Sequence, residues 1–127
     1  MPSWLRYVLA FVVFAHGFVY ARVGAALPRD IPQWTGRSRL LGNALTGPRL
    51  IVLSRVLHVS AGILILACAL ALAFAHPSWR GLAVAGAVVG LIAFAVFWDG
   101  QVKFLAEEGV IGVGASLALL AWALFTR

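Results

Sequence analysis

Residues 50–75 read LIVLSRVLHVSAGILILACALALAFA, a stretch of 26 residues that is apolar apart from two serines, one arginine and one histidine. About 20 apolar residues in a helix span the hydrocarbon core of a bilayer, so this stretch predicts a transmembrane helix. Arg55 and His58 lie one to two turns inside it. Ionisable groups at that depth are costly and usually face other helices. We therefore expect a functional site to be built around these polar groups.

The composition of the chain indicates a membrane protein. Of its 127 residues, 63% are hydrophobic and 11% are charged, against about 25% charged residues in a soluble domain. The apolar stretches leave only short connections, so we expect a single domain, residues 1–127. We interpret the net charge of +6 as a signal that sets the orientation in the membrane and as a source of contacts with anionic lipid head groups. No array of basic and aromatic residues indicates binding to nucleic acid.

Four apolar stretches alternate with short connections. They cover about residues 4–27, 50–75, 80–98 and 104–125. This pattern predicts an all-α fold, an integral membrane four-helix bundle of up-down-up-down topology. The one long connection, residues 28–48, contains three prolines and three glycines. Within it, Ser38 to Leu45 is either one or two turns of a weakly amphipathic surface helix, with Trp34 as an interfacial anchor, or a structured loop.

Basic residues are distributed unequally between the two predicted membrane faces. The face that carries the first and third connections has seven, and the face that carries both termini has three. The seven are Arg22, Arg29, Arg37, Arg39, Arg49, Arg55 and Lys103, and the three are Arg6, Arg80 and Arg127. Because basic residues are enriched on the cytoplasmic side, both termini are expected outside the cytoplasm.

Small residues four positions apart recur in the third span. Gly86 and Gly90 form a GxxxG pair, and the fourth span offers Gly112 and Ser116. Small residues allow the backbones of two helices to approach closely within a membrane. The pattern indicates either packing between the third and fourth spans or the face of a homodimer.

Two histidines lie within the predicted spans. His16 is about 16 Å from the cytoplasmic end of the first span and His58 about 12 Å from the same end of the second, at 1.5 Å per residue. The two imidazoles are therefore expected to be close enough to meet. They have three possible roles: hydrogen bonds to neighbouring helices, the lining of a small cavity or proton path, or axial ligation of a haem b.

Most of the acidic residues gather where the third span meets the fourth. Asp99, Glu107 and Glu108 lie there together with Lys103. Since buried arginines need a partner, Arg55, and also Arg22, are expected to pair with one of these carboxylates. Such pairs either fix the register of the helices or form a polar pocket at the cytoplasmic side that binds an anionic or zwitterionic head group.

Three segments carry a resemblance to known proteins. They read FAHGFVYARVG, RLIVLSRVLHVSAGILILA and AVFWDGQVKFLAEEGVIGV. Together they resemble a family of small uncharacterised bacterial four-span membrane proteins, whose pattern matches here at His16, Gly17, Phe97, Trp98, Asp99 and Lys103. Where the family pattern suggests a second histidine, this chain has Tyr20. The resemblance implies the fold and a bacterial inner membrane, and it implies no activity.

These features favour a non-enzymatic membrane protein that binds a lipid or a small hydrophobic ligand, or an accessory subunit of a larger membrane complex. The alternative is a redox or isomerase-type membrane enzyme that uses His16 and His58 with Asp99 or Glu107. The serines at positions 54, 60 and 116 have no nucleophile context and are expected to bond back to their own helices. The candidate ligand-binding residues are His16, Tyr20, Arg22, Arg55, His58, Trp98, Asp99, Lys103, Glu107 and Glu108.

Overall fold

The computed structural model describes residues 1–29, 31–104 and 109–126, and it is helical apart from one small hairpin. The elements are α1 (Ser3–Ala26), β1 (Arg37–Ser38), β2 (Gly42–Thr46), α2 (Gly47–Ala73), α3 (Trp79–Phe97), the short 3-10 helix η1 (Val102–Phe104) and α5 (Val110–Phe125). The prediction of an all-α fold with four main helices is confirmed.

The helices differ in whether they are long enough to cross a membrane. In the part of the chain that the structure describes, α1, α2 and α3 are long and apolar enough to do so. The helix α5 is apolar but has only 16 residues. The predicted fourth span began near residue 104, whereas α5 begins at Val110. Gly109 before it has a φ of 113°, a left-handed conformation that suits glycine and that a helix cannot continue through.

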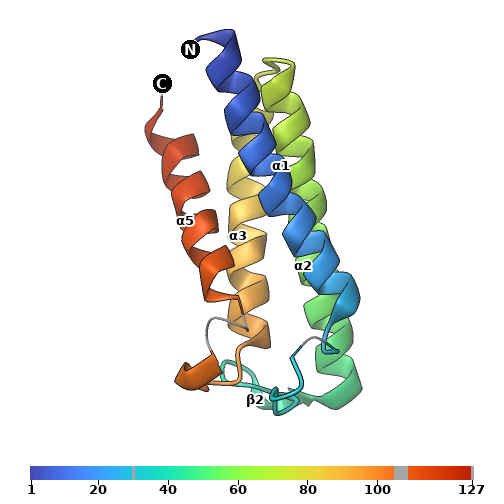
Figure 1. Ribbon diagram of the computed structural model, residues 1–127. Helices are drawn as coiled ribbons and strands as arrows, with labels where there is room; N and C mark the ends of the chain where they lie inside the picture. The colour runs from blue at the N-terminus through green and yellow to red at the C-terminus, as the bar shows by residue number, and fades with distance from the viewer. Residues whose placement is uncertain (30, 105–108, 127) are drawn as a thin grey trace.

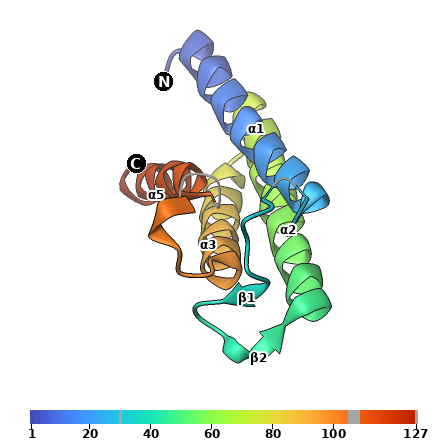
Figure 2. The ribbon, with the colours of Figure 1, turned by 60° about the horizontal axis from the view of Figure 1, so that its bottom comes forward.

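The four helices lie side by side, with both ends of the chain at one end and the hairpin at the other (Figure 1). Helix α1 packs on α2, α2 on α3 and α3 on α5, whereas α1 and α5 have few contacts with each other. Figure 2 shows α1 lying along α2 and α5 lying beside α3. The bundle is therefore open between its first and last helices.

Helices α1 and α2 approach closely because glycines meet at their interface. A Cβ atom on Gly62 would lie 2.6 Å from the backbone nitrogen of Ala21 and 2.8 Å from the carbonyl oxygen of Gly17. A Cβ atom on Gly24 would lie 2.7 Å from the Cβ atom of His58. No side chain fits at these distances, so the absence of one at each glycine sets the separation of the two helices.

The GxxxG pair of α3 is covered within the chain. A Cβ atom on Gly86 would lie 2.7 Å from Cγ1 of Ile65 in α2. A Cβ atom on Gly90 would lie 2.9 Å from the hydroxyl of Tyr20 in α1 and 3.2 Å from that of Ser116 in α5. These contacts agree with intramolecular packing. The partners, however, are α2 and α1 as well as the α5 that the sequence suggested.

The segment Ser38 to Leu45 is part of a hairpin, so its interpretation as a surface helix was wrong. Strands β1 and β2 pair antiparallel, with Arg37 opposite Thr46. The glycines at positions 36, 42 and 47 have φ values of 76°, 55° and 60°. Such left-handed positions interrupt a helix and favour turns, which explains why the segment folds back on itself.

Trp34 packs the connection between α1 and α2 against the end of α3. Its indole nitrogen donates to the carbonyl oxygen of Phe97 at 2.9 Å, and its ring stacks on the ring of Phe97 with the centroids 4.7 Å apart. Its role as an anchor at the membrane interface stays a prediction. The residue packs against the protein, because Phe97 offers both an aromatic face and a carbonyl at the end of its helix.

Candidate functional site

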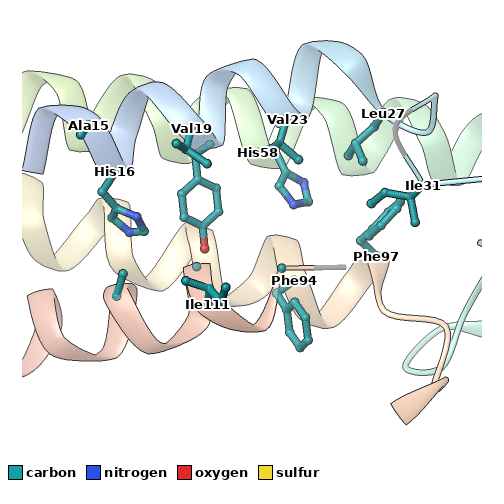
Figure 3. A pocket seen from close by; sticks show the side chains of 14 residues that line it. Ala15, His16, Val19, Val23, Leu27, Ile31, His58, Phe94, Phe97 and Ile111 are labelled. Atoms are coloured by element: carbon teal, nitrogen blue, oxygen red, sulfur yellow. The ribbon is translucent and has the colours of Figure 1, made fainter. Parts of the chain in front are cut away.

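A cavity of about 450 Å³ lies between α1 and α5. It exists because these two helices have few contacts, so that side chains of α2 and α3 form its floor. Figure 3 shows side chains of α1 and α3 facing Ile111 of α5 across it. The described lining is apolar except for two histidines and one tyrosine. It consists of Ala15, His16, Val19, Tyr20, Val23, Leu27, Ile31, His58, Phe94, Phe97, Gly109, Ile111, Gly112 and Ala115.

His16 and Tyr20, one turn apart on α1, both bond to Ser116 of α5. His16 Nε2 lies 3.2 Å from the Ser116 hydroxyl oxygen, and the Tyr20 hydroxyl oxygen lies 3.2 Å from the same atom. The rings of His16 and Tyr20 meet edge to face, with centroids 5.0 Å apart. Because both of these hydrogen bonds go to α1, the expectation that Ser116 bonds to its own helix was wrong. It links α1 to α5 across the bundle.

His58 enters the same cavity from α2, nearer to the hairpin (Figure 3). Its Nδ1 donates to the carbonyl oxygen of Ser54, one turn earlier, at 2.7 Å. Its ring centroid lies 5.8 Å from that of Tyr20 and 5.9 Å from that of Phe97. His16 therefore bonds to a neighbouring helix, as one interpretation expected, whereas His58 bonds to its own helix. Both line the cavity.

The two imidazoles do not meet, contrary to the expectation from their depths. His58 faces Gly24, which lies eight residues after His16 on α1. Eight residues correspond to about 12 Å along a helix. The prediction of the two depths assumed that α1 ends where α2 begins along the bundle axis. In the structure, α2 begins nearer to the hairpin than α1 ends (Figure 1).

A haem held by both histidines does not fit this geometry. Two axial imidazoles must face each other across one iron atom. Here His58 faces a position on α1 that is about two turns away from His16. The ring of Tyr20 contacts both imidazoles. Among the described residues, no group of three His, Cys, Asp or Glu side chains is placed to hold a metal ion.

The cavity is closed at the hairpin end. Leu27, Ile31 and Phe97 form a buried cluster there, against which Val23 and Trp34 pack. The chain after α1 thus folds across the end of the bundle and covers the cavity with apolar side chains.

Arg55 does not form the predicted ion pair with Asp99. Its Nε donates to the carbonyl oxygen of Leu27 at 2.6 Å, just beyond the end of α1, where carbonyl groups lack partners within the helix. Arg22 is exposed on α1. The other predicted partners, Glu107 and Glu108, lie outside the described residues. The half-buried Arg55 is satisfied by a backbone group of the neighbouring helix.

Asp99 organises the connections at the hairpin end. Its carboxylate accepts hydrogen bonds from the backbone nitrogens of Thr35 at 3.1 Å and Gln101 at 3.0 Å, and from the side chain of Gln101 at 2.7 Å. The same amide nitrogen of Gln101 also donates to the carbonyl oxygen of Gln33 at 3.2 Å. Asp99 therefore ties the connection after α1 to the end of α3. It does so outside the lining of the cavity.

Trp98 and Lys103 also lie away from the cavity. The ring of Trp98 stacks with that of Phe94, with centroids 6.2 Å apart, and its carbonyl oxygen accepts from the backbone nitrogen of Arg39 at 2.8 Å. Lys103 is exposed in η1. Of the ten predicted ligand-binding residues, the described cavity brings together only His16, Tyr20 and His58.

Sequence reasoning missed the aromatic wall of the cavity and Ser116. Phe94 and Phe97 are ordinary residues of an apolar span, and nothing in their spacing distinguishes them from lipid-facing phenylalanines. A serine deep in an apolar span is a weak signal for a polar link, because it also bonds readily to its own helix. Only the arrangement of the helices around the cavity shows what these residues contact.

Comparison with known proteins adds no further assignment. No protein-family model matches the sequence, and no curated protein or solved structure matches it either. The function must therefore be argued from the cavity and from its chemistry.

Proposed function

We propose that this chain is a bacterial inner-membrane protein with four spans in up-down-up-down order, and that it binds a lipid or a small hydrophobic molecule in the cavity between α1 and α5. The single observation that carries the proposal is the apolar cavity with its few convergent polar groups. Ligand sites in proteins typically have this character and volumes of about 300–1,000 Å³.

The surface of α1 supports placement in a membrane. Phe11, Phe14 and Phe18 are 71%, 46% and 55% exposed, which is costly in water and favourable against acyl chains. With α1 and α5 both in the bilayer, the space between them faces the hydrocarbon region. A hydrophobic ligand then enters sideways from the membrane and needs no aqueous path.

Substitution of Ala115 tests this proposal. Ala115 lines the cavity from α5, so Ala115→Phe places a benzyl group where the ligand binds. We expect about tenfold less co-purifying ligand per mole of protein, because the benzyl group displaces apolar contacts between the ligand and α5. Mass spectrometry of solvent extracts measures this amount.

Ala121→Phe is the matched control, because Ala121 is on the same helix and exposed. It should retain the ligand of the unmodified protein. Circular dichroism verifies that both variants keep their helices. Equal retention by Ala115→Phe and the unmodified protein would place the ligand elsewhere and overturn the proposal.

The orientation follows from the basic residues near the hairpin. With Arg37, Arg39 and Arg49 on the cytoplasmic side, both termini lie outside the cytoplasm. We expect alkaline phosphatase, which is active only outside the cytoplasm, to be active when fused to the C-terminus. Green fluorescent protein fused there should be dark. Insertion of each reporter in the hairpin provides the opposite control, and a fluorescent C-terminal fusion would reverse the proposed topology.

A further inference from the structure

Nε2 of His58, which lines the cavity, has no hydrogen-bond partner among the described residues. His58 is 5% exposed, and its Nδ1 carries the proton that it donates to the Ser54 carbonyl, because a carbonyl oxygen only accepts. An uncompensated charge in an apolar cavity is costly, and no carboxylate belongs to the described lining. The imidazole is therefore neutral, and its Nε2 is a hydrogen-bond acceptor. No described residue donates to this nitrogen.

We infer that the ligand is a neutral lipid-soluble molecule with a hydroxyl-bearing ring, such as an alkylphenol, a quinol or a cyclic alcohol, and that its hydroxyl donates to His58 Nε2. This inference rests on the proposed function and specifies its ligand. An acceptor that faces an apolar cavity is favourable only when a donor reaches it, and the apolar surroundings leave that role to the ligand.

The walls around His58 favour a ring over a linear head group. Tyr20 lies 5.8 Å and Phe97 5.9 Å from the imidazole, measured between ring centroids. Aromatic faces and edges at these separations accommodate a further ring by offset or edge-to-face contact. Figure 3 shows Phe97 near His58, whereas the ring of Phe94 points away from both.

The rest of the cavity suits the remainder of such a molecule. The polar cluster of His16, Tyr20 and Ser116 lies farther from the hairpin than His58 does. Val19 and Ile111 contribute apolar surface to the lining. Arginine and lysine are absent from the described lining. An anionic head group therefore finds no charged partner there, whereas a neutral hydroxyl finds an acceptor.

The test compares two probes that differ in one hydrogen-bond donor. 4-Decylphenol donates a hydrogen bond through its hydroxyl, and 4-decylanisole, its methyl ether, only accepts. Binding to the full chain in nanodiscs is measured by calorimetry, with empty nanodiscs as the blank. We expect the phenol to bind about tenfold more tightly, as one good hydrogen bond implies.

Two variants isolate the role of the imidazole. His58→Phe keeps an aromatic ring but removes Nε2, so the preference for the phenol should fall to about twofold or less. His76→Phe is the matched control, since His76 is exposed in the turn after α2, and it should keep the full preference. If His58→Phe does not fold, ¹⁵N NMR of the unmodified protein replaces it, because a new donor shifts the Nε2 resonance of His58 upfield.

The outcomes separate this inference from the proposed function. Equal binding of the two probes to the unmodified protein would overturn the hydroxyl assignment while leaving a hydrophobic site. Binding of hexadecan-1-ol as tight as that of 4-decylphenol would overturn the assignment of a ring. No saturable binding of any probe would overturn both the inference and the proposed cavity function.

Discussion

Gly62→Ala is expected to lower the free energy of unfolding by about 2 kcal/mol, the usual cost of an extra carbon in a packed interface. The added Cβ atom would lie 2.6 Å from the backbone nitrogen of Ala21 and 2.8 Å from the carbonyl oxygen of Gly17. Both contacts are with backbone, which cannot rotate away, so α1 and α2 must separate. Unfolding by dodecyl sulfate in mixed micelles, followed by tryptophan fluorescence, measures the change.

Gly114→Ala is the matched control for this experiment. A Cβ atom on Gly114 meets nothing within 4 Å, and replacing glycine by alanine in a helix interior stabilises by about 0.5–1 kcal/mol. The gain in helix propensity is common to both variants, so their difference reports the close approach of α1 and α2. Equal stability of the two variants would show that this interface is not tightly packed.

Ser116→Ala is expected to lower the free energy of unfolding by about 1–2 kcal/mol. The substitution removes the hydroxyl that bonds to both His16 Nε2 and the Tyr20 hydroxyl. Two hydrogen bonds between helices in a membrane are together worth about this much, and the groups left behind remain buried without a partner. The same unfolding experiment in mixed micelles measures the loss.

Ser54→Ala tests whether the loss comes from the hydrogen bonds. Ser54 and Ser116 are both 0% exposed, but the Ser54 hydroxyl has no hydrogen-bond partner among the described residues. Removal of an unpaired buried hydroxyl should leave the stability unchanged or raise it slightly. A loss from Ser54→Ala as large as that from Ser116→Ala would mean that the Ser116 link contributes nothing specific.

The two expected effects concern the two sides of the cavity. Gly62 holds α1 against α2, which sets where His16 and Tyr20 lie relative to His58. Ser116 joins α5 to α1 where these helices otherwise have few contacts. The width of the cavity therefore depends on a close packing contact at one side and on hydrogen bonds at the other.

The sequence alone was sufficient to predict the main helices. Long apolar stretches must satisfy their backbone groups internally in a membrane, and a helix does so within one segment. The pattern of residues 50–75 therefore predicted α2 without knowledge of any partner.

Relations between helices were predicted less well. The sequence placed His16 and His58 at similar depths and offered Asp99 as one possible partner of Arg55, whereas His58 faces Gly24 and Arg55 bonds to the carbonyl of Leu27. Residue counting fixes a position along one helix but not the offset between two. That offset depends here on the close contacts of glycines between α1 and α2 and on the connection after α1, which packs against the end of the bundle.

What the sequence by itself determined is therefore the number and apolar character of the main helices, because these follow from segments that are each self-sufficient in hydrogen bonding. Only the tertiary structure decided that Ser116 contacts His16 and Tyr20, that Phe94 and Phe97 line a cavity, and that Nε2 of His58 has no partner in the described part of the chain. These properties arise from which side chains face each other across helices. In an almost uniformly apolar chain the sequence pattern carries little information about facing, since lipid and protein neighbours accept the same residues.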